Sequence, residues 1–290
     1  MTKRNIHLLI IDPQNDFCDL PVEYLPNDPL NPGQAIAPQL AVPGAHNDML
    51  RLSELMQRGL RGLADISVTL DSHHRVGIER PAMYRYSDGS EVKPFTTIRH
   101  EDLKSGRVVT TNPAAMPRVL AYTAALEAGG RYELMVWTPH CEIGTWGHNV
   151  HANVRDAYNR WEERELGVVN KVTKGSNPWT EHYSAVMAEV PDADDPTTQL
   201  NRSLIDVLAQ SDLVLIAGEA GSHCVKATTE HIADNFGDSL NKLVLLTDCI
   251  SPVGGFEPQY KDFLSNMASR GLQLATTSDM LGELVANGRR

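Results

Sequence analysis

Short apolar runs of strand length alternate with longer amphipathic segments along most of this chain, and the alternation limits the folds that it can adopt. Runs rich in Val, Ile and Leu suit strands that are covered on both faces. Strands that alternate with helices are typical of βαβ units around a parallel sheet, so we predict an α/β fold. The expected strands are 6–11, 65–70, 132–137, 167–172, 212–217 and 242–247, and the expected helices are 47–61, 114–128, 151–165, 199–210, 223–236 and 257–270.

Two stretches interrupt this alternation. Residues 18–45 contain six prolines together with several Asn, Asp and Gly residues, and residues 72–113 mix charge, Gly and Pro without a clear period. Both are long for connections in a compact domain, which is typical of lids or insertions rather than of linkers. We therefore predict one domain over residues 1–290, with insertions at about 18–45 and 72–130.

The charge balance argues against polyanionic partners. Lys and Arg total 26 against 37 Asp and Glu, which gives a formal net charge of −11 and a poor electrostatic match for nucleic acid or anionic lipid. The longest apolar runs, such as LVLIAG, fall short of the roughly 18–20 residues of a membrane-spanning helix. The first residues lack the apolar region and cleavage site of a signal peptide. We expect a cytoplasmic protein that binds neither nucleic acid nor membrane.

The cysteines lie far apart and form no C-x-x-C pair, so a zinc ribbon is not indicated. In a cytoplasmic chain they should be reduced, and each is either a small buried hydrophobe or a reactive thiol. Cys141 has no basic partner beside it in sequence, so we interpret it as structural. The four cysteines are Cys18, Cys141, Cys224 and Cys249.

Cys224 is the strongest candidate for chemistry. It follows a buried strand and a turn with two glycines, and it is expected to begin a helix. A helix N-terminus lowers the pKa of a thiol, and its free N–H groups can hold an oxyanion. The layout resembles a nucleophile elbow, the alternative being a small buried residue in a tight turn. His223 is adjacent, but neighbouring side chains tend to point apart, so we expect no Cys–His dyad.

Polar residues follow two other expected strands. Asp12 comes directly after 6–11, at the carboxyl end where open α/β sheets bind ligands, although a turn cap is the alternative. Asp71 and His73 follow 65–70 as a D-x-H pair, which can place a carboxylate and an imidazole on one metal ion. For this pair alone, a polar loop with solvated histidines remains the alternative.

His140 and Lys174 complete the set of candidates. His140 follows an apolar run and a proline, and Trp137 before it could form one aromatic wall of a pocket, although a lone His beyond a strand is commonly structural. Lys174 follows the strand expected at 167–172. A lysine at a strand end usually reaches water, but one buried beside a thiol would favour the thiolate.

Together these sites resemble the cysteine hydrolases related to isochorismatase, and most closely the nicotinamidases. IDPQNDF, LDSH, WTPHC with GTWG behind it, and the KG…YSA segment leading to AGEAGSHCV appear in the family's order, and the resemblance continues into LLTDCISPV. It implies a three-layer α/β/α fold with a mostly parallel central sheet. It also implies a metal-containing amidohydrolase that converts nicotinamide and water to nicotinate and ammonia.

The same resemblance implies a role for each matching residue. Cys224 would be the nucleophile that forms a thioester, Asp12 the general base and acid, and Lys174 the third catalytic member. The ligands of one divalent metal ion would be Asp71, His73 and His140. The pyridine ring would lie between Phe17 and Trp137. The oxyanion donors would be the backbone N–H groups of Ala220 and Cys224, and a cis peptide would fall at Glu219–Ala220.

The sequence departs from the nicotinamidase pattern after LDSH, where the usual further His followed by Ser-Phe is replaced by HRVGIERPAMY. The fourth metal ligand is therefore unassigned, with His74 the nearest candidate and water the alternative. Two histidines and one carboxylate suit zinc first, and iron or manganese as well. The long insertions could cover the pocket and alter the choice of amide.

Three functions remain open from the sequence. The first is hydrolysis of nicotinamide or a similar aromatic carboxamide. The second is an amidase of the same superfamily that acts on another carboxamide, carbamoyl or ureido substrate. The third is a non-catalytic binding protein, which would be expected to have lost the cysteine or the lysine. In each case the partner is a small molecule, and the family resemblance suggests a homo-oligomer.

Overall fold

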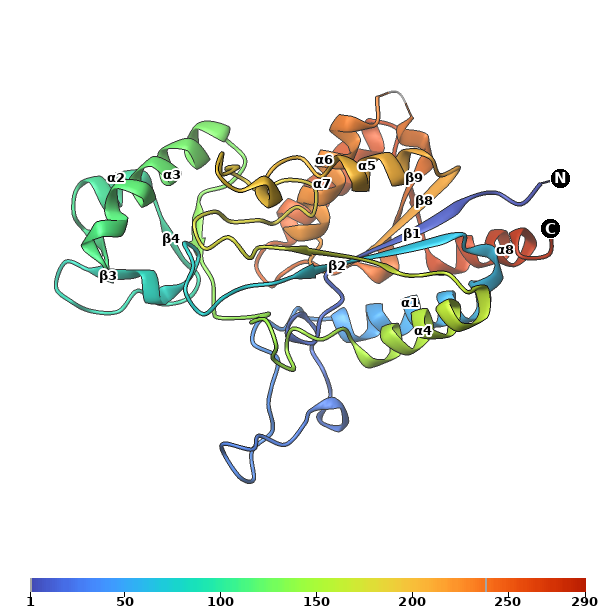
Figure 1. The fold of residues 1–290 in the computed structure, drawn as a ribbon, viewed down its shortest axis with the longest axis horizontal. Coiled ribbons are helices and arrows are strands. Elements are labelled where there is room, and N and C mark those ends of the chain that lie inside the picture. The colour runs from blue at the N-terminus through green and yellow to red at the C-terminus, as the bar shows by residue number, and fades with distance from the viewer. Residues whose placement is uncertain (1, 238) are drawn as a thin grey trace.

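A six-stranded parallel sheet forms the centre of the computed structural model, which describes residues 2–237 and 239–290 (Figure 1). The strand order is β10-β9-β8-β1-β2-β7, and each pairing is parallel. The strands are β1 (Ile6–Ile11), β2 (Asp65–Asp71), β7 (Asn170–Lys174), β8 (Leu213–Gly218), β9 (Leu243–Leu246) and β10 (Gln273–Ala275).

Helices cover both faces of this sheet, which gives the expected three-layer α/β/α architecture (Figure 1). On one face α1 packs against α4 and α8, and on the other lie α5, α6 and α7. No helix of the described residues is both long and apolar enough to span a bilayer. The helices are α1 (Ala45–Gly59), α4 (Ala152–Glu165), α5 (Arg202–Ala209), α6 (Cys224–Asn235), α7 (Glu257–Ser269) and α8 (Thr277–Asn287).

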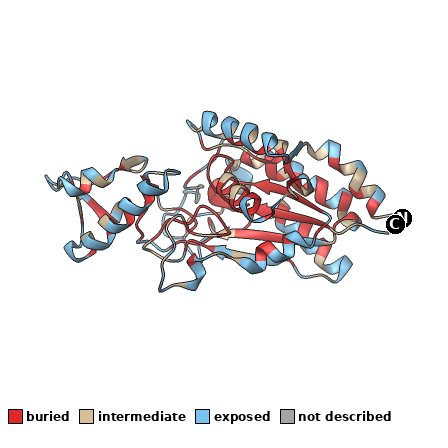
Figure 2. Ribbon diagram, turned by 90° about the horizontal axis from the view of Figure 1, so that it is seen from above, coloured by how far each residue is buried: buried red, intermediate tan, exposed pale blue. Residues whose placement is uncertain are grey.

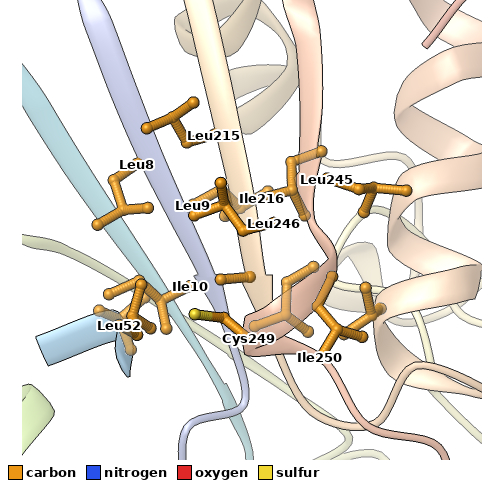
Figure 3. Close-up of a cluster of buried hydrophobic side chains, with 14 of the residues drawn as sticks. Leu8, Leu9, Ile10, Leu52, Leu215, Ile216, Leu245, Leu246, Cys249 and Ile250 are labelled. Atoms are coloured by element: carbon orange, nitrogen blue, oxygen red, sulfur yellow. The ribbon is translucent and has the colours of Figure 1, made fainter. Parts of the chain in front are cut away.

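The main core lies around β1 and β8, whose residues are all buried. Figure 3 shows how side chains of neighbouring strands pack with those of α1 and of the segment after β9. Burial of each such side chain contributes roughly 1.5–3 kcal/mol, so these strands form a rigid base for the residues that follow them. The labelled side chains are Leu8, Leu9, Ile10, Leu52, Leu215, Ile216, Leu245, Leu246, Cys249 and Ile250.

A second, smaller unit is inserted between β2 and α4, and it projects from the sheet on the side opposite to the termini (Figure 2). It has its own hydrophobic core, which includes Ile78, Tyr84, Ile98, Val119 and Val136. The single-domain interpretation of the chain stays a prediction. The elements of the insertion are β3 (Tyr84–Tyr86), β4 (Thr96–Ile98), α2 (His100–Lys104), β5 (Val108–Thr110), α3 (Met116–Gly129) and β6 (Leu134–Val136).

The insertion corrects two expectations. Residues 72–113 contain short strands and a helix, where irregular chain was expected. The strand expected at 132–137 is β6, which pairs antiparallel with β4 and does not join the parallel sheet. An apolar run of this length fits either sheet, because only its partner strand decides where it pairs.

At the other end of the chain, the sequence missed β10 and α8. Residues of β10 are exposed or half-buried, so they form no apolar run. Leu284 of α8 is fully buried where Gly59 and Gly62 allow a close approach to α1. The stretch 18–45 contains the short 3-10 turn Val22–Tyr24 and otherwise runs as loop, as expected (Figure 1).

Candidate active site

The candidate site lies at the carboxyl edge of the parallel sheet. Asp12 follows β1, Asp71 is the last residue of β2, and Lys174 is the last residue of β7. Cys224 is the first residue of α6, which follows β8 after a short turn. Because parallel strands end at the same edge, residues that are far apart in the chain meet there.

Lys174 lies at the centre of this group. Its Nζ is 2.9 Å from Asp12 Oδ2, 2.8 Å from Asp71 Oδ1 and 3.6 Å from Cys224 Sγ, and it also donates to the carbonyl oxygen of His182 at 3.1 Å. Each of these four side chains is buried, with Cys224 only 6% exposed. The structure therefore brings the three residues of the predicted triad into one buried cluster.

Asp12 is held in place by its neighbour on β2. Its backbone lies in the left-handed region, with φ of 45°, and its N–H donates to Thr69 Oγ1 at 3.1 Å. The Thr69 hydroxyl donates in turn to Asp12 Oδ1 at 2.5 Å. One carboxylate oxygen is thus fixed by Thr69, and the other faces Lys174.

Burial and charge together set the protonation of the cluster. Burial raises the pKa of the Cys224 thiol well above its usual value, an effect that Lys174 opposes and Asp12 reinforces. Burial also raises the pKa of Asp12, again against the effect of Lys174. Burial alone would lower the pKa of Lys174, but the carboxylates of Asp12 and Asp71 raise it well above normal. Burial and the nearby carboxylates therefore favour a protonated Cys224 thiol in the resting state, beside the Lys174 ammonium group.

The turn before Cys224 is unusually tight. Gly218 has φ of 119°, and a Cβ there would lie 1.9 Å from the carbonyl oxygen of Ile11. The peptide Glu219–Ala220 is cis, which confirms the expectation from the resemblance. Cys224 begins α6, so its N–H belongs to the first turn, where backbone donors have no partner within the helix. The His223 ring hydrogen-bonds through Nδ1 to the Ser222 hydroxyl at 2.9 Å.

Next to the triad, Asp71, His73 and His140 form a group whose donor atoms all lie within 4.8 Å of one another. Asp71 Oδ2 is 2.8 Å from His73 Nε2 and 3.2 Å from His140 Nε2. Burial lowers the pKa of both histidines, that of His73 to about 3, so both rings are neutral. His74, the nearest candidate for a fourth ligand, is exposed and is not part of this buried group.

The outer nitrogens of the two rings fit the second contacts of metal-bound histidines. His140 Nδ1 lies 2.8 Å from the carbonyl oxygen of Thr138, and His73 Nδ1 lies 3.3 Å from Glu79 Oε1. Arg80 Nη1, a donor, also lies 3.0 Å from His140 Nδ1, whereas His73 Nδ1 faces the Glu79 carboxyl. Both Nε2 atoms face the same Asp71 oxygen. Two imidazole nitrogens and a carboxylate oxygen this close together form a donor set that fits a divalent cation such as zinc, iron or manganese.

Two residues of the insertion support this group and were not found from the sequence. The Arg80 side chain is fully buried, and its guanidinium donates to the carbonyl oxygens of Thr138 at 2.7 Å and His140 at 3.1 Å. Its Nε lies 2.9 Å from Glu79 Oε1. Both residues lie in a stretch without periodicity, and no sequence signal marks them as buried.

Gln14 is a further residue that the sequence analysis missed. Its side-chain amide donates to the carbonyl oxygen of Asp71 at 2.8 Å, and its oxygen accepts the Asp71 N–H at 2.7 Å. The same amide group donates to the carbonyl oxygen of His148 at 2.9 Å. Gln14 therefore fixes the backbone at the end of β2, from which the Asp71 carboxylate reaches both Lys174 and the histidines.

A cavity opens beside Cys224, and the two expected aromatic residues, Phe17 and Trp137, both line it. The Trp137 indole N–H donates to the Tyr183 hydroxyl at 3.0 Å, which fixes this wall. Glu181, which the sequence did not single out, also lines the cavity, and burial raises the pKa of its carboxyl well above normal. The full lining is Phe17, Leu40, Asp71, Trp137, His140, Lys174, Glu181, Tyr183, Ala220, His223, Cys224 and Val253.

Comparison with known proteins identifies the fold. No family model and no curated protein sequence matches the chain. A yeast nicotinamidase bound to the inhibitor nicotinaldehyde has a TM-score of 0.61 at 20% identity, over 93% of this chain and 99% of that chain. A Pyrococcus horikoshii pyrazinamidase in complex with zinc has a TM-score of 0.51 at 16% identity, over 94% and 99%.

A third solved structure is described only by its class. It is an isochorismatase-like hydrolase from Alkaliphilus metalliredigens, with a TM-score of 0.51 at 13% identity over 96% of this chain and 98% of that chain. At such identities the likeness establishes the architecture. The chain therefore has the fold of the isochorismatase-like hydrolases, as its motifs predicted.

Proposed function

We propose that this protein is a metal-containing cysteine amidohydrolase of the nicotinamidase type, which hydrolyses nicotinamide to nicotinate and ammonia. The observation that carries the proposal is the position of Lys174 Nζ, which contacts Asp12, Asp71 and Cys224 inside a buried pocket. Thioester chemistry needs a thiol, a carboxylate that can take the thiol proton, and a cation that balances the resulting negative charge. The two nicotinamidase-type structures with the same fold support this substrate class.

In the first half of the reaction, Asp12 takes the proton from Cys224 as the sulfur attacks the amide carbon. The N–H groups of Ala220 and Cys224 would donate hydrogen bonds to the negatively charged carbonyl oxygen, since Ala220 lines the cavity and Cys224 begins α6. Asp12 then returns its proton to the departing nitrogen, which leaves as ammonia. The product is a thioester on Cys224.

In the second half, Asp12 takes a proton from water as the water attacks the thioester carbon. The C–S bond then breaks, the acid is released and Asp12 returns the proton to the Cys224 sulfur. Lys174 stays charged throughout and balances, in turn, the thiolate and the Asp12 carboxylate. Phe17 and Trp137 hold the ring in the pocket. Asp71, His73 and His140 would hold a divalent metal ion, which would supply a positive charge that helps to orient the substrate ring.

The choice of amide has a second candidate within the same superfamily. Leu40, from the 18–45 insertion, and the buried carboxyl of Glu181 both line the cavity. An extra hydrogen-bonding group in the pocket favours a carboxamide, carbamoyl or ureido substrate with a polar substituent beside its reacting carbon. The reaction steps at Cys224 would be the same.

Ammonia release from a panel of amides tests both candidates. We expect turnover of nicotinamide that is abolished in Cys224→Ala and retained in Cys249→Ala, a second buried cysteine that does not line the pocket. Turnover of carbamoyl or ureido compounds but not of nicotinamide would select the second candidate. Equal turnover by wild type and Cys224→Ala would overturn the thioester chemistry for both.

A further inference from the structure

Behind the Cys224 turn, two acidic side chains that the proposed chemistry does not use are buried against each other. Glu219 directly precedes Ala220 and is fully buried, and Asp48, in the first turn of α1, is 2% exposed. Both carboxyl groups accept from the same residue, Glu219 from the Ser251 N–H and Asp48 from the Ser251 hydroxyl, so they lie side by side. Two elements that are distant in the chain are thus joined by a pair of acids directly beside a proposed oxyanion donor.

Two buried carboxyl groups held this close together can hydrogen-bond to each other only if one of them holds a proton. An ionised carboxylate is an acceptor only, so two of them cannot hydrogen-bond. Asp48 accepts the Ser251 hydroxyl at 2.5 Å and pairs with Arg51, whereas Glu219 accepts only the Ser251 N–H, at 3.2 Å on Oε2. When both acids are ionised, Glu219 Oε1 has no donor among the described residues. The proton therefore belongs on Glu219, with Asp48 as the carboxylate.

The surroundings keep that proton in place. Burial raises the pKa of Glu219 well above its usual value, and the charge of Asp48 adds to this. Burial likewise raises the pKa of Asp48. Other titratable groups near the pair are Cys18, Asp19, Arg51, Asp248, Cys249 and Tyr260. Of these groups, Arg51 is the one that carries a positive charge.

Ser251 connects the pair to the turn. It donates its N–H to Glu219 and its hydroxyl to Asp48, and its carbonyl oxygen accepts the N–H of Gly221 at 2.8 Å. Ala220 lies between the two residues that are held in this way. The acid pair and Ser251 therefore fix the peptide that carries the Ala220 N–H against α1 and against the segment after β9.

We propose that Glu219 and Asp48 are positioning residues, and that the proton they share keeps the Ala220 N–H aimed at the substrate oxygen. Loss of the proton would place two negative carboxylates against each other with Arg51 as the nearby cation. Their repulsion would displace the turn that carries Ala220. The inference rests on the proposed amidase activity for its kinetic part. Its structural part, the shared proton itself, can be measured without activity.

Glu219→Gln tests the proposal, because the glutamine amide donates to Asp48 at any pH. Loss of one oxyanion donor lowers kcat by about 10²–10³, so the ratio of kcat in Glu219→Gln to that in wild type should rise about tenfold or more from about pH 6 to about pH 10. KM should change little. Glu219→Leu, which cannot donate, should lower kcat at every pH. Glu54→Gln, on the exposed face of α1, is the control and should follow wild type.

The thermal unfolding midpoint, Tm, is the readout that does not need activity. A carboxyl whose pKa is raised by folding stabilises the protein most below the unfolded value of 4.5, and this stabilisation is lost as pH rises toward the folded value. The Tm of wild type should therefore fall relative to that of Glu219→Gln as pH increases. Parallel Tm curves for the two proteins would overturn the shared proton, whether or not the protein hydrolyses amides. A Tm difference with parallel kcat profiles would overturn the positioning role.

Discussion

The carboxyl edge of the sheet and the inserted unit of residues 72–136 contribute to the same site in different ways. The edge supplies the reacting groups, because Lys174 ends a strand of the central sheet and Asp12 and Cys224 lie just beyond two others. The insertion has its own core and projects away from the sheet (Figure 2). Glu79 nevertheless contacts the His73 ring, and Arg80 donates to the carbonyl oxygen of His140. The topology of the sheet thus positions the reacting groups, whereas the insertion supplies residues that surround the candidate metal ligands.

The largest effect is expected at the edge, from Lys174→Met. This change leaves Asp12 and Asp71 buried without their cation, which should cost about 3–5 kcal/mol of unfolding free energy. It should also lower kcat by about a thousandfold, since the thiolate loses its balancing charge. Urea unfolding and ammonia release measure the two effects. Lys171→Met, exposed on the same strand, is the control, and a similar loss there would show that the strand rather than the ammonium group is responsible.

Between the two regions, His73→Ala and His74→Ala form a matched pair. The first removes a buried donor of the metal group and should abolish stoichiometric metal in the purified protein. The second removes an exposed neighbour and should leave the metal content unchanged. Elemental analysis measures the metal content of both proteins. Loss of metal in His74→Ala alone would show that His73 is not a ligand.

Within the insertion, Arg80→Met should weaken metal binding by about 10–100-fold, because residues that orient metal ligands have effects of this size. The guanidinium fixes the backbone of Thr138 and His140, so its loss frees the His140 ring. Competition with a chelator measures the affinity. Arg85→Met, exposed in the same insertion, should bind metal as wild type does. Equal metal affinities of wild type, Arg80→Met and Arg85→Met would show that Arg80 of the insertion does not support the metal site.

The smallest effect is expected from single-methylene deletions in the two cores. Ile98→Val in the insertion and Ile10→Val in the sheet should each cost about 0.5–1.5 kcal/mol. If the insertion unfolds independently, Ile98→Val shifts an early urea transition and Ile10→Val a later one. One common transition that both variants shift would instead support the single-domain prediction.

The same contrast explains what the sequence could predict. β1 and β8 are fully buried, so their apolar runs locate them, and the residues that follow them become candidates for chemistry. Asp12 and Cys224 became candidates in this way, as did the polar residues that follow other expected strands. The resemblance of the surrounding motifs then gave these residues roles and added Phe17 and Ala220. The convergence of these residues follows from parallel topology alone.

Other residues of the site could not be predicted because their burial depends on distant partners. Glu79, Glu181 and Glu219 are acidic residues of a kind that is usually exposed, and each is buried only because of its tertiary neighbours. Arg80 lies in a stretch without periodicity. The strand β6 was placed in the wrong sheet for the same reason, since β4, its partner, had not been recognised.

The central claim is that Cys224 forms a covalent thioester with the help of Asp12 and Lys174. Acid quenching during turnover of nicotinamide, followed by mass spectrometry of the Cys224 peptide, tests it most directly. The account predicts a nicotinoyl group on Cys224 in wild type and accumulation of free nicotinate only when Cys224 is present. Nicotinate formed without any adduct, and at an equal rate by Cys224→Ala, would contradict it.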